Sequence, residues 1–316
     1  MKGAYRVIIQ NKRIRYDFEI KRNITVIRGD SATGKTTLIE MVQEYYRNGN
    51  SSAIELVCEK KCVTILSPAW KYELSAISDS IVFIDEDAEY IFTNEFATTI
   101  KNSDNYYVIV TRAPIPSLPY SVDEIYEIKT SGKYHSFKKM YNSSESHFYT
   151  KEKKNSWDVE VVLTEDSKSG YQFFANYFID ITCFSAGSNT KIFNWLNDSK
   201  KDGKVLVIAD GAAFGSQIDK VLKLQSSVDF QLCLPESFEW LILKSGIIKV
   251  NGIEDVLRNP SVYIESSENF SWEEFFTSYL IQKTKGTPFA YKKIKLNPVY
   301  SNKVNAEKIM KEIQSE

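Results

Sequence analysis

The pattern of apolar and polar positions changes along the chain, and it begins with strict alternation. Residues 5–9 and 14–20 alternate, and the polar pair Asn11-Lys12 lies between them. A period of two is typical of a strand with one buried face, so this stretch predicts a β-hairpin. The run 24–27 that follows is mostly apolar, and it predicts a buried strand.

Further apolar runs in the first half predict core strands at 63–66, 80–84 and 107–110, with helices at 35–46 and 70–77. Fully apolar strands that alternate with helices are typical of a parallel sheet. Residues 124–129 and 133–140 predict a closing hairpin around Ser131-Gly132. The polar, charged stretch 141–155 has no period and predicts a domain boundary.

Strands and helices alternate again in the second half. The strands are predicted at 159–163, 179–184, 204–209 and 230–234, and the helices at 171–178, 191–196, 236–243, 272–282 and 305–313. Repeated βα units imply a parallel sheet with right-handed crossovers. The pattern predicts two α/β domains, at 1–141 and 157–316, joined by a linker at 142–156.

Composition narrows the class of protein. The 316 residues allow two domains, and the net charge of −1 provides no overall field to attract nucleic acid. The four cysteines lack paired C-x-x-C spacing, so we expect reduced thiols and no zinc site. No signal-like or membrane-spanning apolar stretch is evident, which favours a cytoplasmic protein without a membrane partner.

A glycine-containing stretch joins the strand predicted at 24–27 to the helix predicted at 35–46. It reads Gly29-Asp30-Ser31-Ala32-Thr33-Gly34-Lys35-Thr36 and continues into Thr37. The glycines let the backbone wrap around phosphates, and the N–H groups at the helix start point at the anion. This pattern predicts a phosphate loop that binds ATP. Lys35 would reach the β- and γ-phosphates, and the Thr36 hydroxyl would ligate Mg²⁺.

Acidic residues follow the apolar run 80–84, at the end of a predicted parallel strand where ligands bind. We expect Asp85 to hold Mg²⁺ through water and Glu86 to orient or deprotonate the attacking water. Arg112 follows the apolar run 107–110, and two interpretations stay open. It either places a positive charge near the γ-phosphate or lies on the surface at a strand end.

The first half resembles the ATP-binding-cassette-like ATPases, including those of the OLD nucleases. The resemblance lies in the hairpin before the phosphate loop, Ile84-Asp85-Glu86 and Val108-Ile109-Val110-Thr111-Arg112. In that family the last strand usually ends in Thr-His, so Arg112 stands in place of the switch histidine. The short interval between Thr36 and Asp85 has no Ser-Gly-Gly-Gln-type signature. This departure argues against the usual ATP-sandwiched dimer and against fast hydrolysis.

In the second half, Glu165 and Asp210 each follow a predicted strand, at the edge where a parallel sheet keeps its site. Two converging carboxylates there would bind Mg²⁺ or Mn²⁺. From spacing alone, the simpler interpretation is that both acids cap the helices that follow them.

Residues 157–245 resemble a Toprim domain, the metal-binding fold of primases, topoisomerases and OLD-type nucleases. Glu165 matches the first acid of that fold, and Ser185-Ala186-Gly187 with Asn189 matches its middle turn. The last motif is matched by Asp210-Gly211-Ala212-Ala213-Phe214-Gly215, in which Ala212 replaces the second Asp. The resemblance implies that Glu165 and Asp210 are catalytic metal ligands. Four acids are candidates for the missing carboxylate: Asp166, Asp219, Glu236 and Glu239.

Two features near the C-terminus have alternative interpretations. An aromatic stripe predicts core packing rather than a base-stacking platform; it comprises Trp272, Phe275, Phe276, Tyr279 and Leu280. The lysines of 283–285 and 292–295, with Phe289 and Tyr291 between them, either follow a phosphate backbone or form a solvated loop.

The leading hypothesis is an ATP-binding and ATP-hydrolysing protein whose nucleotide state gates a metal-dependent action on nucleic acid. Phage defence or a mobile element is its context by analogy. The alternative is a non-catalytic regulatory or scaffold protein whose Toprim-like domain recognises a partner. A small-molecule kinase is a third hypothesis, although few Arg residues lie near the motifs. Nucleic acid, a partner protein and a second copy of the chain are alternative partners besides ATP.

Overall fold

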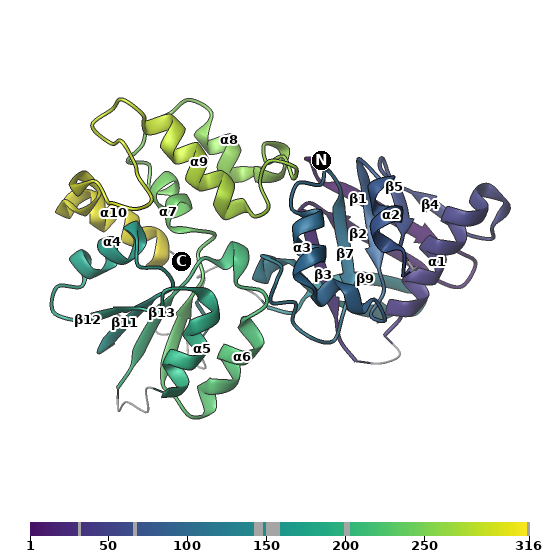
Figure 1. Ribbon diagram of the computed structural model, residues 1–316, viewed down its shortest axis with the longest axis horizontal. Helices are drawn as coiled ribbons and strands as arrows, with labels where there is room; N and C mark the ends of the chain where they lie inside the picture. The colour runs from purple at the N-terminus through teal and green to yellow at the C-terminus, as the bar shows by residue number, and fades with distance from the viewer. Residues whose placement is uncertain (31–32, 66–67, 142–147, 150–158, 199–202, 315–316) are drawn as a thin grey trace. The chain divides into compact units, whose positions relative to one another are not determined.

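The computed structural model describes residues 1–30, 33–65, 68–141, 148–149, 159–198 and 203–314, and the chain divides into two compact units (Figure 1). The first unit comprises Met1–Tyr141 and Asn259–Ser271, and the second comprises Asn142–Arg258 and Trp272–Glu316. Residues 259–271, which the sequence placed in the second domain, therefore belong to the first unit. Most of the predicted linker lies outside the described residues.

A mixed sheet forms the centre of the first unit. Its described strands are β1 (Tyr5–Gln10), β2 (Arg15–Ile20), β3 (Ile24–Arg28), β4 (Glu55–Val57), β5 (Lys61–Thr64), β6 (Ser80–Ile84), β7 (Tyr106–Val110), β8 (Ile125–Ser131) and β9 (Tyr134–Lys139). Their order is β4-β1-β2-β9-β8-β3-β7-β6-β5. Strands β8, β3, β7, β6 and β5 pair in parallel, whereas β1 pairs antiparallel with both β2 and β4. The predicted α/β class is confirmed.

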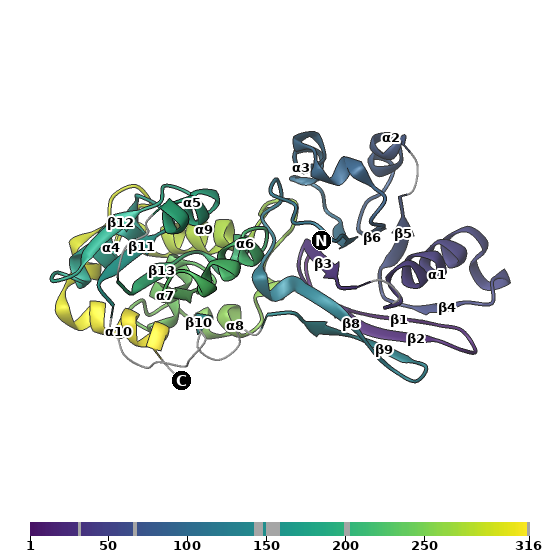
Figure 2. The same ribbon diagram turned by 90° about the horizontal axis from the view of Figure 1, so that it is seen from below.

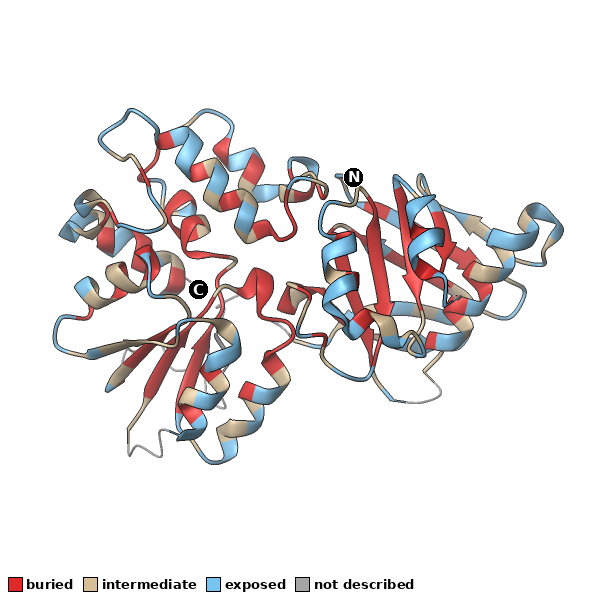
Figure 3. Ribbon diagram, in the orientation of Figure 1, coloured by how far each residue is buried: buried red, intermediate tan, exposed pale blue. Residues whose placement is uncertain are grey.

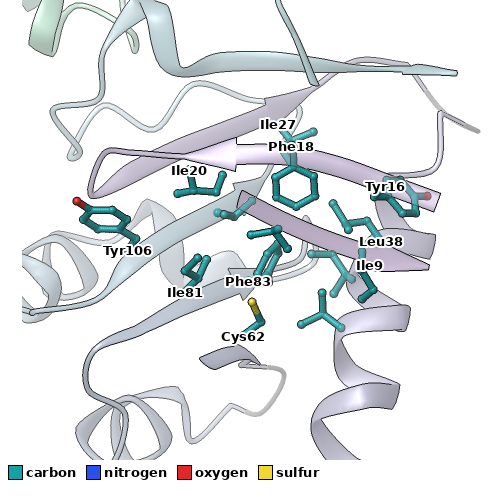
Figure 4. Packing of buried hydrophobic residues seen from close by; sticks show 14 of the residues in the cluster. Ile9, Tyr16, Phe18, Ile20, Ile27, Leu38, Cys62, Ile81, Phe83 and Tyr106 are labelled. Atoms are coloured by element: carbon teal, nitrogen blue, oxygen red, sulfur yellow. The ribbon is translucent and has the colours of Figure 1, made fainter. Parts of the chain in front are cut away.

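Three described α-helices of this unit pack against the sheet through their apolar faces. They are α1 (Lys35–Asn48), α2 (Trp70–Ser75) and α3 (Asn94–Ile100). Helix α1 buries Leu38 and Val42, four positions apart on one face, and it packs beside β1, β4 and β5 (Figure 2). In the core below it, Phe18 and Phe83 meet edge to face with their ring centroids 6.4 Å apart (Figure 4).

The second unit contains a smaller, mostly parallel sheet. Its strands are β10 (Phe148–Tyr149), β11 (Val161–Thr164), β12 (Thr182–Ser185), β13 (Val205–Ile208) and β14 (Phe230–Cys233), in the order β10-β14-β13-β11-β12. Its helices are α4 (Ser169–Tyr177), α5 (Asn189–Asp198), α6 (Ile218–Lys223), α7 (Phe238–Lys244), α8 (Ile253–Arg258), α9 (Trp272–Thr284) and α10 (Lys303–Gln314). Because the chain runs outward in one direction from β11 to β12 and in the other from β13 to β14, the strand order reverses between β11 and β13. That reversal is where open α/β sheets bind ligands.

Burial follows the predicted patterns, since β3, β6 and β7 are buried along their whole length (Figure 3). Of the predicted stripe of α9, Trp272, Phe276 and Leu280 are buried as expected, whereas Phe275 and Tyr279 are half-buried. Helix α7 begins at Phe238 rather than Glu236, because the Ser237 hydroxyl accepts a hydrogen bond from the Trp240 N–H at 3.1 Å. Among the described residues, no helix has the length and apolar character needed to cross a membrane.

Candidate functional sites in the two units

The predicted phosphate loop leaves the C-terminal end of β3 and enters α1 at Lys35. Ser31 and Ala32 lie outside the described residues. The buried Lys35 directs its Nζ to the loop itself, where it donates to Gly29 O at 2.8 Å, Asp30 O at 2.6 Å and Thr33 Oγ1 at 3.2 Å. The loop oxygens therefore hold a positive charge at the start of α1, beside N–H groups that the helix leaves without internal partners.

Gly34 has a conformation that the loop requires. Its φ is 94°, in the left-handed region, and a Cβ there would lie 2.7 Å from Tyr16 Oη. Tyr16 Oη in turn donates a hydrogen bond to Gly34 O at 2.7 Å. A side chain at this position would therefore strain the backbone and displace Tyr16.

Two aromatic residues beside the loop were not predicted from the sequence. Tyr16 on β2 and His135 on β9 place their ring centroids 4.7 Å apart, next to Gly34. Burial raises the pKa of Tyr16 to about 12 and lowers the pKa of His135, so both are uncharged at neutral pH. Only the pairing of distant strands brings them to the loop.

The acids of β6 lie at the same edge of the sheet, with β7 between β3 and β6. Asp85 is half-buried, and its Oδ1 accepts a hydrogen bond from the Glu86 N–H at 2.8 Å. Burial raises the pKa of Asp85, and the charge of Lys35 acts in the opposite direction. The structure thus brings Asp85 within electrostatic reach of Lys35, as the sequence predicts. Thr36 is exposed and Thr37 half-buried on the first turn of α1.

Glu86 and Arg112 form an ion pair with each other. Arg112 Nε donates to Glu86 Oε2 at 3.0 Å, and its Nη2 donates to Oε1 at 2.9 Å. The Arg112 side chain is 63% exposed and that of Glu86 is 24% exposed. The carboxylate predicted to activate water is therefore held by the arginine, an arrangement that sequence reasoning did not consider.

In the second unit, Glu165 follows β11 and Asp210 follows β13, one on each side of the reversal in strand order. Glu165 Oε2 accepts a hydrogen bond from the Asp210 N–H at 3.0 Å. Asp210 Oδ1 accepts one at 3.1 Å from the N–H of Phe238, the first residue of α7. The two acids lie together, as predicted. Asp210 does not cap the helical turn that follows it in the chain; it bonds instead to the first residue of α7.

Glu239 and Glu273 surround a half-buried lysine in the same region. Lys293 Nζ lies 2.9 Å from Glu239 Oε1 and 3.3 Å from Glu273 Oε1. Tyr291 Oη also donates to Glu239 Oε1, at 2.6 Å. Glu239 was one of four candidates for the missing carboxylate, whereas Lys293 was read as part of an exposed basic segment. Tyr291 is buried and the half-buried Lys293 is paired with acids, so at these two positions the segment is neither a solvated loop nor open to a phosphate backbone.

Burial dominates the electrostatics of this cluster. It raises the pKa of Glu165 to about 8, and the charge of Glu273 adds to the effect. Burial and the charge of Glu273 also raise the pKa of the half-buried Asp210. Burial disfavours the charge of Lys293, but Asp210, Glu239 and Glu273 outweigh it and raise the lysine pKa. The lysine is therefore charged, and Glu165 is neutral at neutral pH.

Little free space remains beside these residues. The cavity lined by Glu165, Asp210 and Lys293 has a volume of about 20 Å³, enough for a single water molecule. The neighbouring Gly211 has no room for a side chain, because a Cβ there would lie 2.7 Å from Leu234 O. Ala212 is buried and supplies no oxygen ligand.

The described residues do not fit a metal centre in the second unit. Within them, no group of three or more His, Cys, Asp or Glu side chains is arranged to hold a metal ion. Glu165 Oε2 and Asp210 Oδ1 accept bonds from backbone N–H groups, and Glu239 and Glu273 bind Lys293. No family model, curated protein or solved structure matches the chain.

Proposed function

We propose that the first unit binds ATP at the loop of residues 29–37, and that the chain is an ATP-dependent regulatory protein whose second unit recognises a partner. The observation that supports ATP binding is the buried Lys35 ammonium, held by three loop oxygens at the N-terminus of α1. A charge so placed, with uncapped helix N–H groups beside it, suits the phosphates of a nucleotide.

A divalent ion fits the first unit. Thr36 follows Lys35 in the first turn of α1, and Asp85 follows β6 within electrostatic reach of that lysine. These two residues would hold Mg²⁺, which would neutralise phosphate charge when bound. Glu86 would orient or deprotonate the attacking water once Arg112 releases its carboxylate. Because no Ser-Gly-Gly-Gln-type signature lies between Thr36 and Asp85, we expect slow hydrolysis.

The test is a calorimetric titration of the full-length protein with ATP in the presence of Mg²⁺. Lys35→Ala should weaken binding about 100-fold, the effect of losing about 3 kcal/mol of charge-assisted contacts. Lys12→Ala, which changes an exposed lysine in the first hairpin, should leave the affinity unchanged. Equal affinities for wild type and the folded Lys35→Ala variant would exclude the loop as the binding site.

Metal-dependent cleavage of nucleic acid is a second candidate function for the second unit. The observation in its favour is that Glu165 and Asp210 meet at the reversal in strand order. Single- and double-stranded DNA and RNA would be incubated with the protein and Mg²⁺ or Mn²⁺, with and without ATP. Cleavage that Glu165→Ala and Asp210→Ala both abolish would establish this function in place of partner recognition.

A further inference from the structure

Lys293 reaches the carboxylate cluster of the second unit from a segment that the structure fixes in place. The Lys293 O accepts a hydrogen bond from the Ser169 N–H at 3.0 Å. One residue further on, Ile294 O accepts a bond from Gln172 Nε2 at 3.0 Å, and Leu296 N donates to Gln172 Oε1 at 2.9 Å. The backbone at the lysine and on its C-terminal side is thus attached to α4.

The neighbouring Tyr291 strengthens this attachment. Its hydroxyl contacts Ser169 Oγ and donates to Glu239 Oε1. Glu239 is fully buried, and its second oxygen, Oε2, has no hydrogen-bond partner among the described residues. A buried carboxylate needs a compensating positive charge, and Lys293 is the cation in contact with it.

We propose that the Lys293 ammonium is the resident cation of this cluster and occupies the position that a divalent ion would otherwise take. A divalent ion binds carboxylate oxygens at about 2.0–2.6 Å and brings further ligands or water. The adjoining cavity of about 20 Å³ holds about one water molecule, too little space for the ion together with its further ligands, and the ammonium would repel the ion. The inference does not depend on ATP binding in the first unit.

The first experiment measures Mn²⁺ binding to the full-length protein without nucleotide, from the spectrum of the free ion. Wild type should bind no Mn²⁺ through this cluster. The total Mn²⁺ binding of Glu239→Gln should therefore equal that of wild type. Lys293→Met removes the charge and should raise Mn²⁺ affinity by at least about tenfold. The double variant Lys293→Met/Glu239→Gln should lose that gain. Lys292→Met, which changes an exposed lysine one position away, should behave as wild type.

A second experiment uses wild type alone, so it does not require Lys293→Met to fold. Lysines are acylated with a limiting reagent, and each site is quantified by mass spectrometry. Lys292 and Lys295 are exposed, so they should react, whereas Lys293 should be protected. Mn²⁺ should leave the protection of Lys293 unchanged.

Three results would overturn the proposal. The first is Mn²⁺ binding by wild type that Glu239→Gln abolishes. The second is a Lys293→Met variant that is folded by circular dichroism but gains no Mn²⁺ affinity. The third is acylation of Lys293 as fast as that of Lys292, or protection that Mn²⁺ removes.

Discussion

The two units place acids at the same kind of position but balance their charges differently. In each, a carboxylate follows a buried parallel strand: Asp85 and Glu86 after β6, and Glu165 after β11. In the first unit, Glu86 is held by Arg112, which is 63% exposed. In the second, the fully buried Glu239 is held by Lys293, whose side chain is 20% exposed.

This difference shows that a strand-end carboxylate does not define a function by itself. Water can replace an exposed arginine when an ion pair opens, so the first unit can rearrange around a nucleotide. A pair whose carboxylate is fully buried has no such replacement at that carboxylate, and opening the pair leaves its charge in a medium of low polarity. The first unit has the properties of a binding site, whereas the second has those of a fixed network.

Removal of the Lys293 cation should have the largest effect on stability. Lys293→Met leaves the Glu239 carboxylate without its counter-charge, and loss of one partner from a buried pair costs about 3–5 kcal/mol. Urea unfolding would measure the change, with Lys292→Met as the control. A loss no larger than that of the control would contradict the comparison between the units.

The second-largest effect on stability is expected at Gly34 of the phosphate loop. Gly34 has φ 94° and Gly132 has φ 60°. Of the two, only Gly34 has atoms within 4 Å of the position of an added Cβ, and the nearest is Tyr16 Oη. Gly34→Ala and Gly132→Ala should each lose about 1–2 kcal/mol of stability from the left-handed backbone. Gly34→Ala alone should also weaken ATP binding in a titration. Similar ATP affinities for the two variants would show that the Tyr16 contact is not required.

A pH dependence should mark the second unit. The pKa of Glu165 rises from 4.5 to about 8 on folding, so its protonated form stabilises the fold. That stabilisation is fully present below pH 4.5 and is lost as the pH rises to about 8. Glu165→Gln cannot ionise and should flatten this part of the stability profile, whereas the exposed Glu254→Gln should not. If the melting temperature of Glu165→Gln fell with rising pH as steeply as that of wild type, Glu165 would not be the group responsible.

The smallest effect is expected from the exposed ion pair of the first unit. Arg112→Ala should leave the free energy of unfolding unchanged within error, because water replaces the guanidinium. The ratio of ATP to ADP affinity should also stay constant, since Arg112 contacts Glu86. A selective loss of ATP affinity would instead favour the interpretation that places Arg112 near the γ-phosphate.

Much of the fold could be predicted because its signals are local. The alternation of β1 and β2, the apolar runs of β6 and β13 and the amphipathic face of α1 each lie within one short window. Elements such as β4 and α3 were not predicted, since their short sequences show no clear run or period of apolar residues. The segment 247–263, which showed little pattern, contains the six-residue helix α8.

The candidate sites divide in the same way. The phosphate loop is one continuous motif, so Lys35 and its neighbours could be named from the sequence. Tyr16 and His135 could not, because strand pairing alone brings them together. Lys293 resembled its exposed neighbours Lys292 and Lys295 in sequence, and only the attachment of its backbone to α4 turns it toward the acids.

The return of residues 259–271 to the first unit has a practical consequence for dissecting the protein. The Met1 amino group bonds to Glu265 and Ser266, and Asn23 Nδ2 donates to Asn269 O at 3.0 Å and Phe270 O at 2.8 Å. A fragment that stops at residue 141 would lack these partners. A protease that cuts once between 142 and 158 would likewise leave two pieces held together, because the later piece still contains part of the first unit.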